Sequence, residues 1–242
     1  MAENHEKLFR SGLDRLRNRV YANMTQAPAK QLKPSQPWWP AVLAVLAMCG
    51  LYLCLPESLT FGPSWLLLAV VFVLMVPAVI ARIRGSFTLN QVLGYIVLGF
   101  VTAAMLWSLF MLIRSLILHR ITPDELLRSA VALWATNFLV FATWYWRLDA
   151  GGPHARHLRG NHTEGDFLFP QMTLSPRTEK PLQESWSPGF VDYLFLAFNT
   201  STAFSPTDSP VLSRWAKVAM MVQSTVSFAT VALLAARAVN IL

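Results

Sequence analysis

Long apolar segments that hold no Lys, Arg, Asp or Glu alternate with short charged ones along this chain. The five segments cover residues 38–55, 64–81, 91–113, 129–146 and 218–236, with lengths of 18, 18, 23, 18 and 19 residues. A charge-free apolar segment of 18 residues is long enough for an α-helix that crosses a bilayer. Surface helices of a soluble domain need a polar face, so this pattern excludes a soluble enzyme, a secreted disulfide scaffold and a disordered chain. We predict an all-α integral membrane protein with five transmembrane helices.

Two further helices are expected outside these segments. Residues 1–24 place apolar residues at helical spacing among several arginines, a pattern typical of an amphipathic helix on an anionic membrane surface or packed on the protein. Residues 189–204 also have a helical pattern, but their uninterrupted apolar stretch, Tyr193 to Phe198, is only six residues long. Since this is too short to cross a bilayer, we predict a short re-entrant helix over 189–204.

The pattern divides the chain into four parts. These are an N-terminal amphipathic helix and linker, a four-helix transmembrane region, a polar loop, and a final unit with the short helix, a turn and the last transmembrane helix. Their ranges are 1–37, 38–146, 147–187 and 188–242. Within the second part, Thr122-Pro123-Asp124-Glu125 has the N-cap, first-position proline and acidic first turn that start a helix.

The net charge of +7 adds an orientation to this picture. The Lys and Arg residues flank the apolar segments, so the membrane explains them better than nucleic acid does. Seven of them lie in residues 1–37, which places the N-terminus in the cytoplasm. With 189–204 re-entrant, 16 basic residues lie inside and 4 outside; if that helix crosses fully, the split is 15 to 5. The count does not decide between the two topologies. We expect a multi-pass protein of a bacterial inner membrane with a cytoplasmic N-terminus.

The turn after the short helix is the clearest functional candidate. It is rich in hydroxyl, carboxamide and carboxylate side chains and lies between two apolar helices, where irregular backbone survives only if it is buried in protein or lines water. We therefore name as pore or ion-binding candidates Asn199, Thr200, Thr202, Ser205, Thr207 and Asp208. The alternative is an interfacial loop whose hydroxyls cap helix ends.

The last helix has a polar face formed by Gln223, Ser227 and Thr230, at spacings of four and three residues. Such a face can line an aqueous path, or it can join helices through hydrogen bonds. Asn137 in the fourth apolar segment is a plausible partner for it, as a structural hydrogen bond. Both interpretations stay open at this point.

Motifs of enzymes and metal sites do not occur in the sequence. It has no phosphate-binding glycine loop, no nucleophile elbow and no His-Glu-x-x-His helix. His154, His157 and His162 fit no closed zinc spacing, and Cys49 and Cys54 lie about 140° apart around one helix. We expect no catalytic residue, no metal site and no cofactor.

Four segments resemble a family of uncharacterised bacterial multi-pass membrane proteins: Trp146 to Pro153, Asp166 to Met172, Asp192 to Asp208 and Ala235 to Ile241. That resemblance implies no established activity. Residues 190–242 are also similar, more weakly, to the pore helix, turn and inner helix of tetrameric cation channels. That likeness places Thr202 at the filter threonine and Ser205-Pro206-Thr207 where those channels have Gly-Tyr-Gly. Since both glycines are replaced, the resemblance does not extend to a potassium-selective filter.

Two functional hypotheses follow. The first is an ion-channel-like pore-loop protein that conducts small cations as a homo-oligomer, because one short helix cannot enclose a path. The second is a non-transporting membrane scaffold or accessory protein that binds partners through its basic N-terminal helix and the loop 147–187. In both, the bilayer surrounds the protein and nucleic acid is not a partner.

Overall fold

The structure is a computed structural model that describes residues 37–118, 120–159, 165–173, 186–202 and 209–239. Regular structure in this part of the chain is helical, apart from one isolated bridge between Phe167 and Val211. The elements are α2 (Trp39–Leu53), η1 (Glu57–Leu59), α3 (Ser64–Ile83), α4 (Phe87–Ile117), α5 (Pro123–Leu148), η2 (Asp149–Gly151), α6 (Pro153–Arg159), α7 (Pro170–Thr173), α8 (Phe190–Thr202) and α9 (Arg214–Val239). The predicted all-α fold is confirmed, while the N-terminal helix 1–24 lies outside the described residues.

Four of these helices, α3, α4, α5 and α9, are long and apolar enough to cross a membrane. Their outward faces carry large exposed apolar side chains such as Phe72, Val73 and Phe228. A water-soluble protein does not expose apolar side chains on this scale, so the protein is a membrane protein. Helix α2 has 15 residues and is shorter than the other four. Four of the five predicted spans therefore have the length for a crossing, and the fifth stays a prediction.

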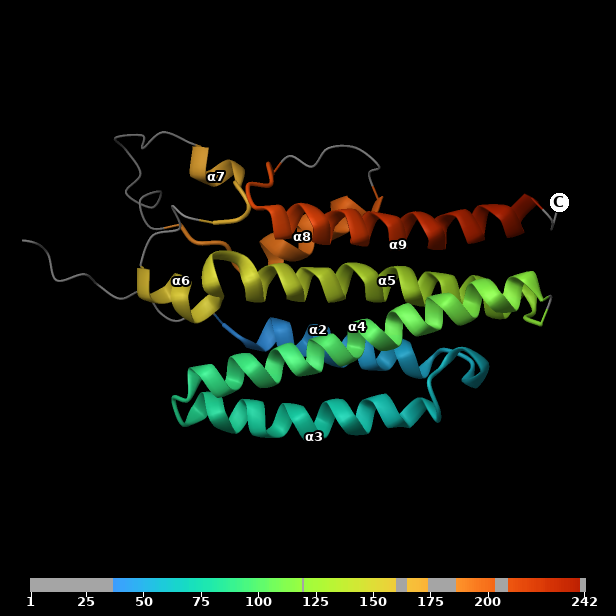
Figure 1. Ribbon diagram of the computed structural model, residues 1–242, viewed down its shortest axis with the longest axis horizontal. Helices are drawn as coiled ribbons and strands as arrows, with labels where there is room; N and C mark the ends of the chain where they lie inside the picture. The colour runs from blue at the N-terminus through green and yellow to red at the C-terminus, as the bar shows by residue number, and fades with distance from the viewer. Residues whose placement is uncertain (1–36, 119, 160–164, 174–185, 203–208, 240–242) are drawn as a thin grey trace, which may run out of the picture. The chain divides into compact units, whose positions relative to one another are not determined.

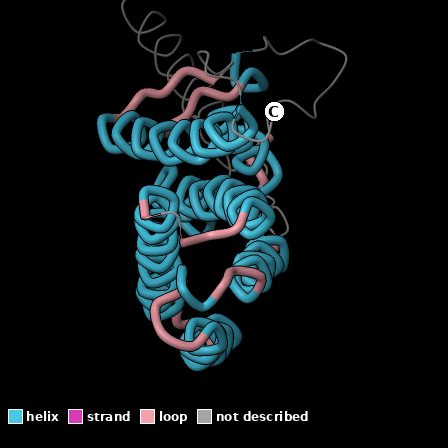
Figure 2. Tube along the Cα trace, turned by 90° about the vertical axis from the view of Figure 1, so that its right-hand side faces the viewer, coloured by secondary structure: helices cyan, strands magenta, loops and turns pink. Residues whose placement is uncertain are grey.

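Helix α5 is central to the part of the chain from residue 35 onward, which forms one compact unit. It contacts α2 and α4 on one side and α8 and α9 on the other (Figure 1). In Figure 2, which views most of the helices nearly along their axes, α3 lies beyond α4 and makes no large contact with α5. Because both sides of α5 are covered, it carries buried polar residues that a lipid-facing helix could not accommodate.

The start of α5 has the predicted N-cap at Thr122, which forms a capping box with Glu125. The Thr122 hydroxyl accepts a hydrogen bond from the Glu125 backbone N–H at 3.3 Å, and the Glu125 carboxylate accepts one from the Thr122 backbone N–H at 3.1 Å. Pro123 occupies the first helical position. These bonds satisfy backbone amide groups that the first turn would otherwise leave unpaired, so the N-terminal end of α5 is well defined.

At its other end, α5 leads into a sharp reversal over residues 150–152. Ala150, Gly151 and Gly152 all have positive φ angles, of 50°, 79° and 93°. A Cβ atom on Gly152 would lie 2.8 Å from the Arg147 carbonyl oxygen, so the turn requires glycine at this position. The reversal directs α6 back toward the end of α5.

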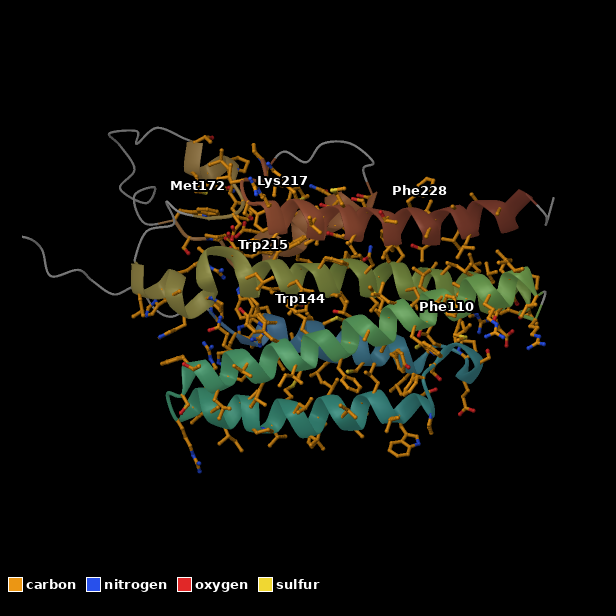
Figure 3. The ribbon with its side chains drawn as sticks, in the orientation of Figure 1. Phe110, Trp144, Met172, Trp215, Lys217 and Phe228 are labelled. Carbon is orange, nitrogen blue, oxygen red and sulfur yellow. The ribbon has the colours of Figure 1, made fainter. Side chains whose placement is uncertain are left out.

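The predicted polar loop 147–187 contains the short helices η2, α6 and α7. Its residues 166–168 pair with the segment just before α9. The Leu168 backbone N–H donates to the Pro210 carbonyl at 2.9 Å, and the Leu212 N–H donates to the Asp166 carbonyl at 2.8 Å. This small antiparallel contact holds the chain just before α9 against the end of α5. Figure 3 shows Trp215 and Lys217 near this end of α9.

Candidate functional site

Helix α8 begins near the C-terminal end of α5. The chain lies near that end again just before α9 begins. At the start of α8, the Tyr193 hydroxyl donates a hydrogen bond to the Asp149 carboxylate, directly after α5. At its end, Ser201 contacts Asn137, halfway along α5. After the turn, Leu212 bonds to Asp166, whose own N–H bonds to Asp149. The chain therefore runs from the end of α5 to its middle and back.

The predicted residues on α8 have different surroundings. Thr200 is buried and its hydroxyl donates to the Leu196 carbonyl at 2.8 Å, whereas Thr202 is exposed and donates to the Phe198 carbonyl at 3.0 Å. Both hydroxyls thus bond within α8 itself. Asn199 is half-buried and lines a cavity together with residues of α7 and the segment before α9. The candidates Ser205, Thr207 and Asp208 lie outside the described residues.

Gln223 of α9 is the centre of a buried hydrogen-bond cluster. Its Oε1 accepts from the Tyr145 hydroxyl at 2.6 Å, and its Nε2 donates to Ser201 Oγ at 2.8 Å and to the Ala197 carbonyl. Gln223, Ser201 and Tyr145 are each at most 1% exposed. The cluster therefore joins α5, α8 and α9 through one side chain.

Ser227 and Thr230 continue the same face of α9. The Ser227 hydroxyl donates to the Ser201 carbonyl, and the Thr230 hydroxyl donates within α9 to Val226 and Ser227, each at 2.8 Å. Both side chains are fully buried, as Gln223 is. The structure thus directs this polar face toward α8 and α5, and its pore-lining role stays a prediction.

Asn137 is confirmed as the partner of this face. Its Nδ2 donates to the Gln223 carbonyl at 3.1 Å and to Ser201 Oγ at 3.4 Å. Its Oδ1 is buried and has no hydrogen-bond partner among the described residues. An acceptor of this kind at the end of α8 costs free energy unless water or another donor reaches it.

A second buried polar cluster surrounds Asp149, and sequence reasoning missed it. The Asp149 carboxylate accepts hydrogen bonds from the Tyr193 hydroxyl and the Asp166 backbone N–H. Arg156 of α6 donates to the Asp149 carbonyl at 2.7 Å and to the Trp146 carbonyl at 2.9 Å. Asp149 is fully buried and Arg156 is 3% exposed. The signals in the sequence were a lone aspartate directly after an apolar segment and the two glycines that follow it.

Opposing effects act on the pKa of Arg156 in this cluster. Burial lowers the pKa of Arg156, whereas the neighbouring Tyr193 and Asp149 raise it. The guanidinium lies 5.2 Å from the centre of the Tyr193 ring, a cation–π contact. Arginine remains a cation in proteins, so a buried positive charge here faces a buried carboxylate. Arg156 thus holds α6 against the end of α5, and the Tyr193 hydrogen bond to Asp149 joins the start of α8 to the same end.

Aromatic rings enclose the cluster on the side of α9. Phe167 lies against Tyr145 at 5.0 Å, Trp215 at 6.0 Å and Tyr193 at 6.3 Å between ring centres. Phe169 packs on the same Tyr193 ring at 5.4 Å. Because these rings exclude water, the hydrogen bonds to Asp149 are stronger than they would be at the surface.

Asp192 lies in the first turn of α8, where an acidic side chain is favourable. The Asp192 carboxylate accepts a hydrogen bond from the Gly189 backbone N–H at 2.7 Å. Asp192 also borders the cavity that Asn199 lines, with Gln171 of α7 and Ser209 nearby. Asp192 therefore caps the helix rather than standing alone in the bilayer.

Metal-ligand chemistry has little support where the structure describes the chain. These residues contain no group of three His, Cys, Asp or Glu side chains that could hold a metal ion. His154 stacks on Phe87 at 3.7 Å between ring centres, and His162 lies outside the described residues. Both cysteines are free thiols.

Comparison of the chain with models of protein families, with curated proteins and with solved structures finds no match. The resemblances to uncharacterised membrane proteins and to cation channels therefore stay expectations from the sequence.

Proposed function

We propose that this protein is an ion-channel-like pore-loop protein of a bacterial inner membrane that conducts small cations. The observation that carries the proposal is the path of α8, which starts beside Asp149 and ends beside Asn137, before Leu212 returns to Asp166. A pore loop is a segment that enters the membrane as a short helix, turns, and leaves on the same side, followed by a longer helix. In this reading α8 is re-entrant.

The charge distribution agrees with this topology. With α2, α3, α4, α5 and α9 crossing, 16 Lys and Arg residues lie on the side of the N-terminus and 4 on the other side. Cytoplasmic segments carry the excess of basic residues, so the end of α5 that holds Asp149 faces the cytoplasm. The pore loop then enters from the cytoplasmic face.

The buried clusters give α8 the rigidity that ion selection needs. Gln223 and Asp149 each bond α8 to a neighbouring helix or helix end, one near its tip and one near its start. Ions are bound by hydroxyl, carbonyl and carboxylate oxygens, and Thr202 with Asp208 at the turn supplies such groups. One α8 cannot enclose a path, so the proposed pore forms in a homo-oligomer.

Cation flux in proteoliposomes tests this function. The purified protein should carry K⁺ or Na⁺ across vesicles above the level of protein-free vesicles, and Thr202→Ala and Asp208→Asn should each change that flux. Thr88→Ala is the matched control, because Thr88 is exposed in the first turn of α4, outside α8 and α9. Flux equal to that of empty vesicles, across several cations and voltages, would refute the proposal.

One observation favours a second candidate, a non-transporting scaffold or accessory protein. The polar face of α9 is used inside the subunit, where Gln223, Ser227 and Thr230 are all fully buried. An inner helix without a polar face toward the pore axis has less to offer a hydrated ion. On this reading the α8 unit is a structural element, and the protein binds partners through residues 1–24 and 147–187.

The scaffold function predicts a defined complex that depends on those two regions. Deletion of residues 1–24, or replacement of residues 174–185 by a Gly/Ser linker of equal length, should release a partner that co-purifies with the full chain. The transmembrane unit should keep its thermal stability in both variants. A protein that purifies alone and tolerates both changes contradicts this alternative.

A further inference from the structure

A second cavity opens among α2, α3, α4 and α5, at the end of the molecule where α5 leads into Asp149. Its volume is small, about 60 Å³, and it opens to the surface of the protein. Two arginines from different helices border it, Arg82 in the last turn of α3 and Arg147 in the last turn of α5. The remaining lining is mostly apolar, and it contains no Asp or Glu among the described residues.

Among the described residues, no acidic side chain lines the cavity beside Arg82 and Arg147. Both side chains border the same cavity, and the Arg147 guanidinium lies 6.0 Å from the centre of the Trp146 ring. Arg82 lies over the ring of Trp38 at 5.9 Å. Two neighbouring positive charges that are partly removed from water are costly unless an anion is present. An anionic group between them would offset this cost.

Gly94 of α4 gives Arg147 its place in this cavity. A Cβ atom on residue 94 would overlap the guanidinium group of Arg147. Glycine therefore lets the charged group lie flat against the backbone of α4. Asn90, one turn earlier, donates to the Ala78 carbonyl at 2.8 Å and joins the ends of α3 and α4 beside the two arginines.

We propose that the mouth of this cavity binds an anionic phospholipid, with its phosphate between Arg82 and Arg147 and its acyl chain against the half-buried side chains of Val42, Met75 and Val79. The apolar lining consists of Ala41, Val42, Val45, Met75, Val79, Val97 and Leu98. Guanidinium groups bind phosphate oxygens in a planar, bidentate manner, and basic pockets between transmembrane helices bind anionic head groups. The acyl-chain contacts distinguish a lipid from a soluble phosphate. This inference is independent of the proposed pore.

Native mass spectrometry of the full chain in detergent, with added phosphatidylglycerol or phosphatidylcholine, tests the site. Phosphatidylglycerol should bind at least tenfold more tightly than phosphatidylcholine. Arg82→Gln and Arg147→Gln should each weaken phosphatidylglycerol binding about tenfold. Arg84→Gln is the matched control, since Arg84 is exposed two residues after Arg82 and does not line the cavity; its affinity should stay within twofold of the parent.

A further variant separates the site from the overall charge. Gly94→Ala keeps both arginines but displaces the Arg147 guanidinium, so it should weaken phosphatidylglycerol binding as much as Arg147→Gln does. If Arg82→Gln and Gly94→Ala bind this lipid as well as Arg84→Gln does, the proposal is wrong. Competition by millimolar inorganic phosphate would also overturn it, because the site would then serve a soluble anion.

Discussion

At the scale of single residues, Gln223 of α9 forms side-chain hydrogen bonds to both α5 and α8. Its side chain bonds to Tyr145, Ala197 and Ser201, and none of these bonds is open to water. Interhelical hydrogen bonds in membranes contribute about 0.6 kcal/mol each, and up to about 1.7 kcal/mol. Gln223→Leu should therefore destabilise the protein by about 2 kcal/mol, measured as a lower Tm in detergent.

Thr225→Val is the control for that change. Thr225 lies two residues away on the same helix, is exposed, and bonds only the Met221 carbonyl of α9 at 2.8 Å. Its replacement should leave Tm nearly unchanged. Equal Tm values for the two variants would mean that the Gln223 cluster does not hold the helices together.

Asp149 is the corresponding residue at the other end of α8. Its carboxylate accepts hydrogen bonds from Tyr193 and from the Asp166 N–H, while Arg156 lies beside it. Asp149→Asn keeps the shape and the backbone carbonyl that Arg156 bonds, but it replaces one carboxylate oxygen with a donor that faces the donor of Tyr193 or Asp166. The expected loss is about 2 kcal/mol, because a buried hydrogen bond to a charged acceptor is lost.

Limited proteolysis checks this prediction at the site itself. The segment 166–168 and the segment before α9 are both held near Asp149, so Asp149→Asn should speed cleavage within residues 165–173 and 209–213. Asp124→Asn is the control: Asp124 is an exposed acid in the first turn of α5, and its loss costs only a fraction of a kcal/mol. Unchanged cleavage in Asp149→Asn would contradict the role given to this carboxylate.

At the scale of helices, the hydrophobic pattern locates the elements well and their ends less well. The segments 64–81, 91–113, 129–146 and 218–236 form helices that extend beyond the charge-free stretches, because charged residues such as Arg82 and Arg114 continue the last turns. The short helix predicted over 189–204 is described as Phe190–Thr202. Periodicity is a local property, so it succeeds for each helix separately.

The candidate sites depend on contacts that no local pattern contains. Asp149 meets Tyr193 across 44 residues, and Asn137 meets Gln223 across 86. The second contact was predictable, because a polar residue inside an apolar segment needs a partner and few partners are available. The first was not, since the turn at Gly152 and the pairing of Asp166 with Leu212 decide it. The juxtaposition of Arg82 and Arg147 was equally hidden, because each arginine alone is an ordinary flanking charge.

The re-entrant path of α8 can be tested at this scale by cysteine labelling. In a chain with Cys49 and Cys54 replaced by alanine, single cysteines at Gln171, Leu212 and Arg120 report the side of each segment. All three positions are exposed in the structure. Gln171 and Leu212 lie before and after α8, so a membrane-impermeant maleimide should label both from the same side. Arg120, between α4 and α5, should be labelled from the opposite side and serves as the reference.

At the scale of the whole molecule, the proposed orientation rests on the charge asymmetry. If α2, α3, α4, α5 and α9 cross and α8 does not, the two ends of the chain lie on opposite sides. The positive-inside rule then predicts that the N-terminal side, with 16 basic residues, faces the cytoplasm. A fusion after Leu242 should therefore show alkaline phosphatase activity in the periplasm, whereas a green fluorescent protein fusion at the same position should stay dark.

A crossing α8 would reverse this result, because six crossings return the C-terminus to the cytoplasm. A bright, phosphatase-inactive fusion after Leu242 would thus contradict the re-entrant topology, or the crossing of the 15-residue α2, and the labelling at Gln171 and Leu212 tells these apart. A fusion to the N-terminus is the control, since the basic residues of 1–37 keep that end inside in either case. The pore-loop proposal needs the re-entrant outcome, whereas the phospholipid site needs only that the end of α5 beside Arg147 lies at a membrane surface.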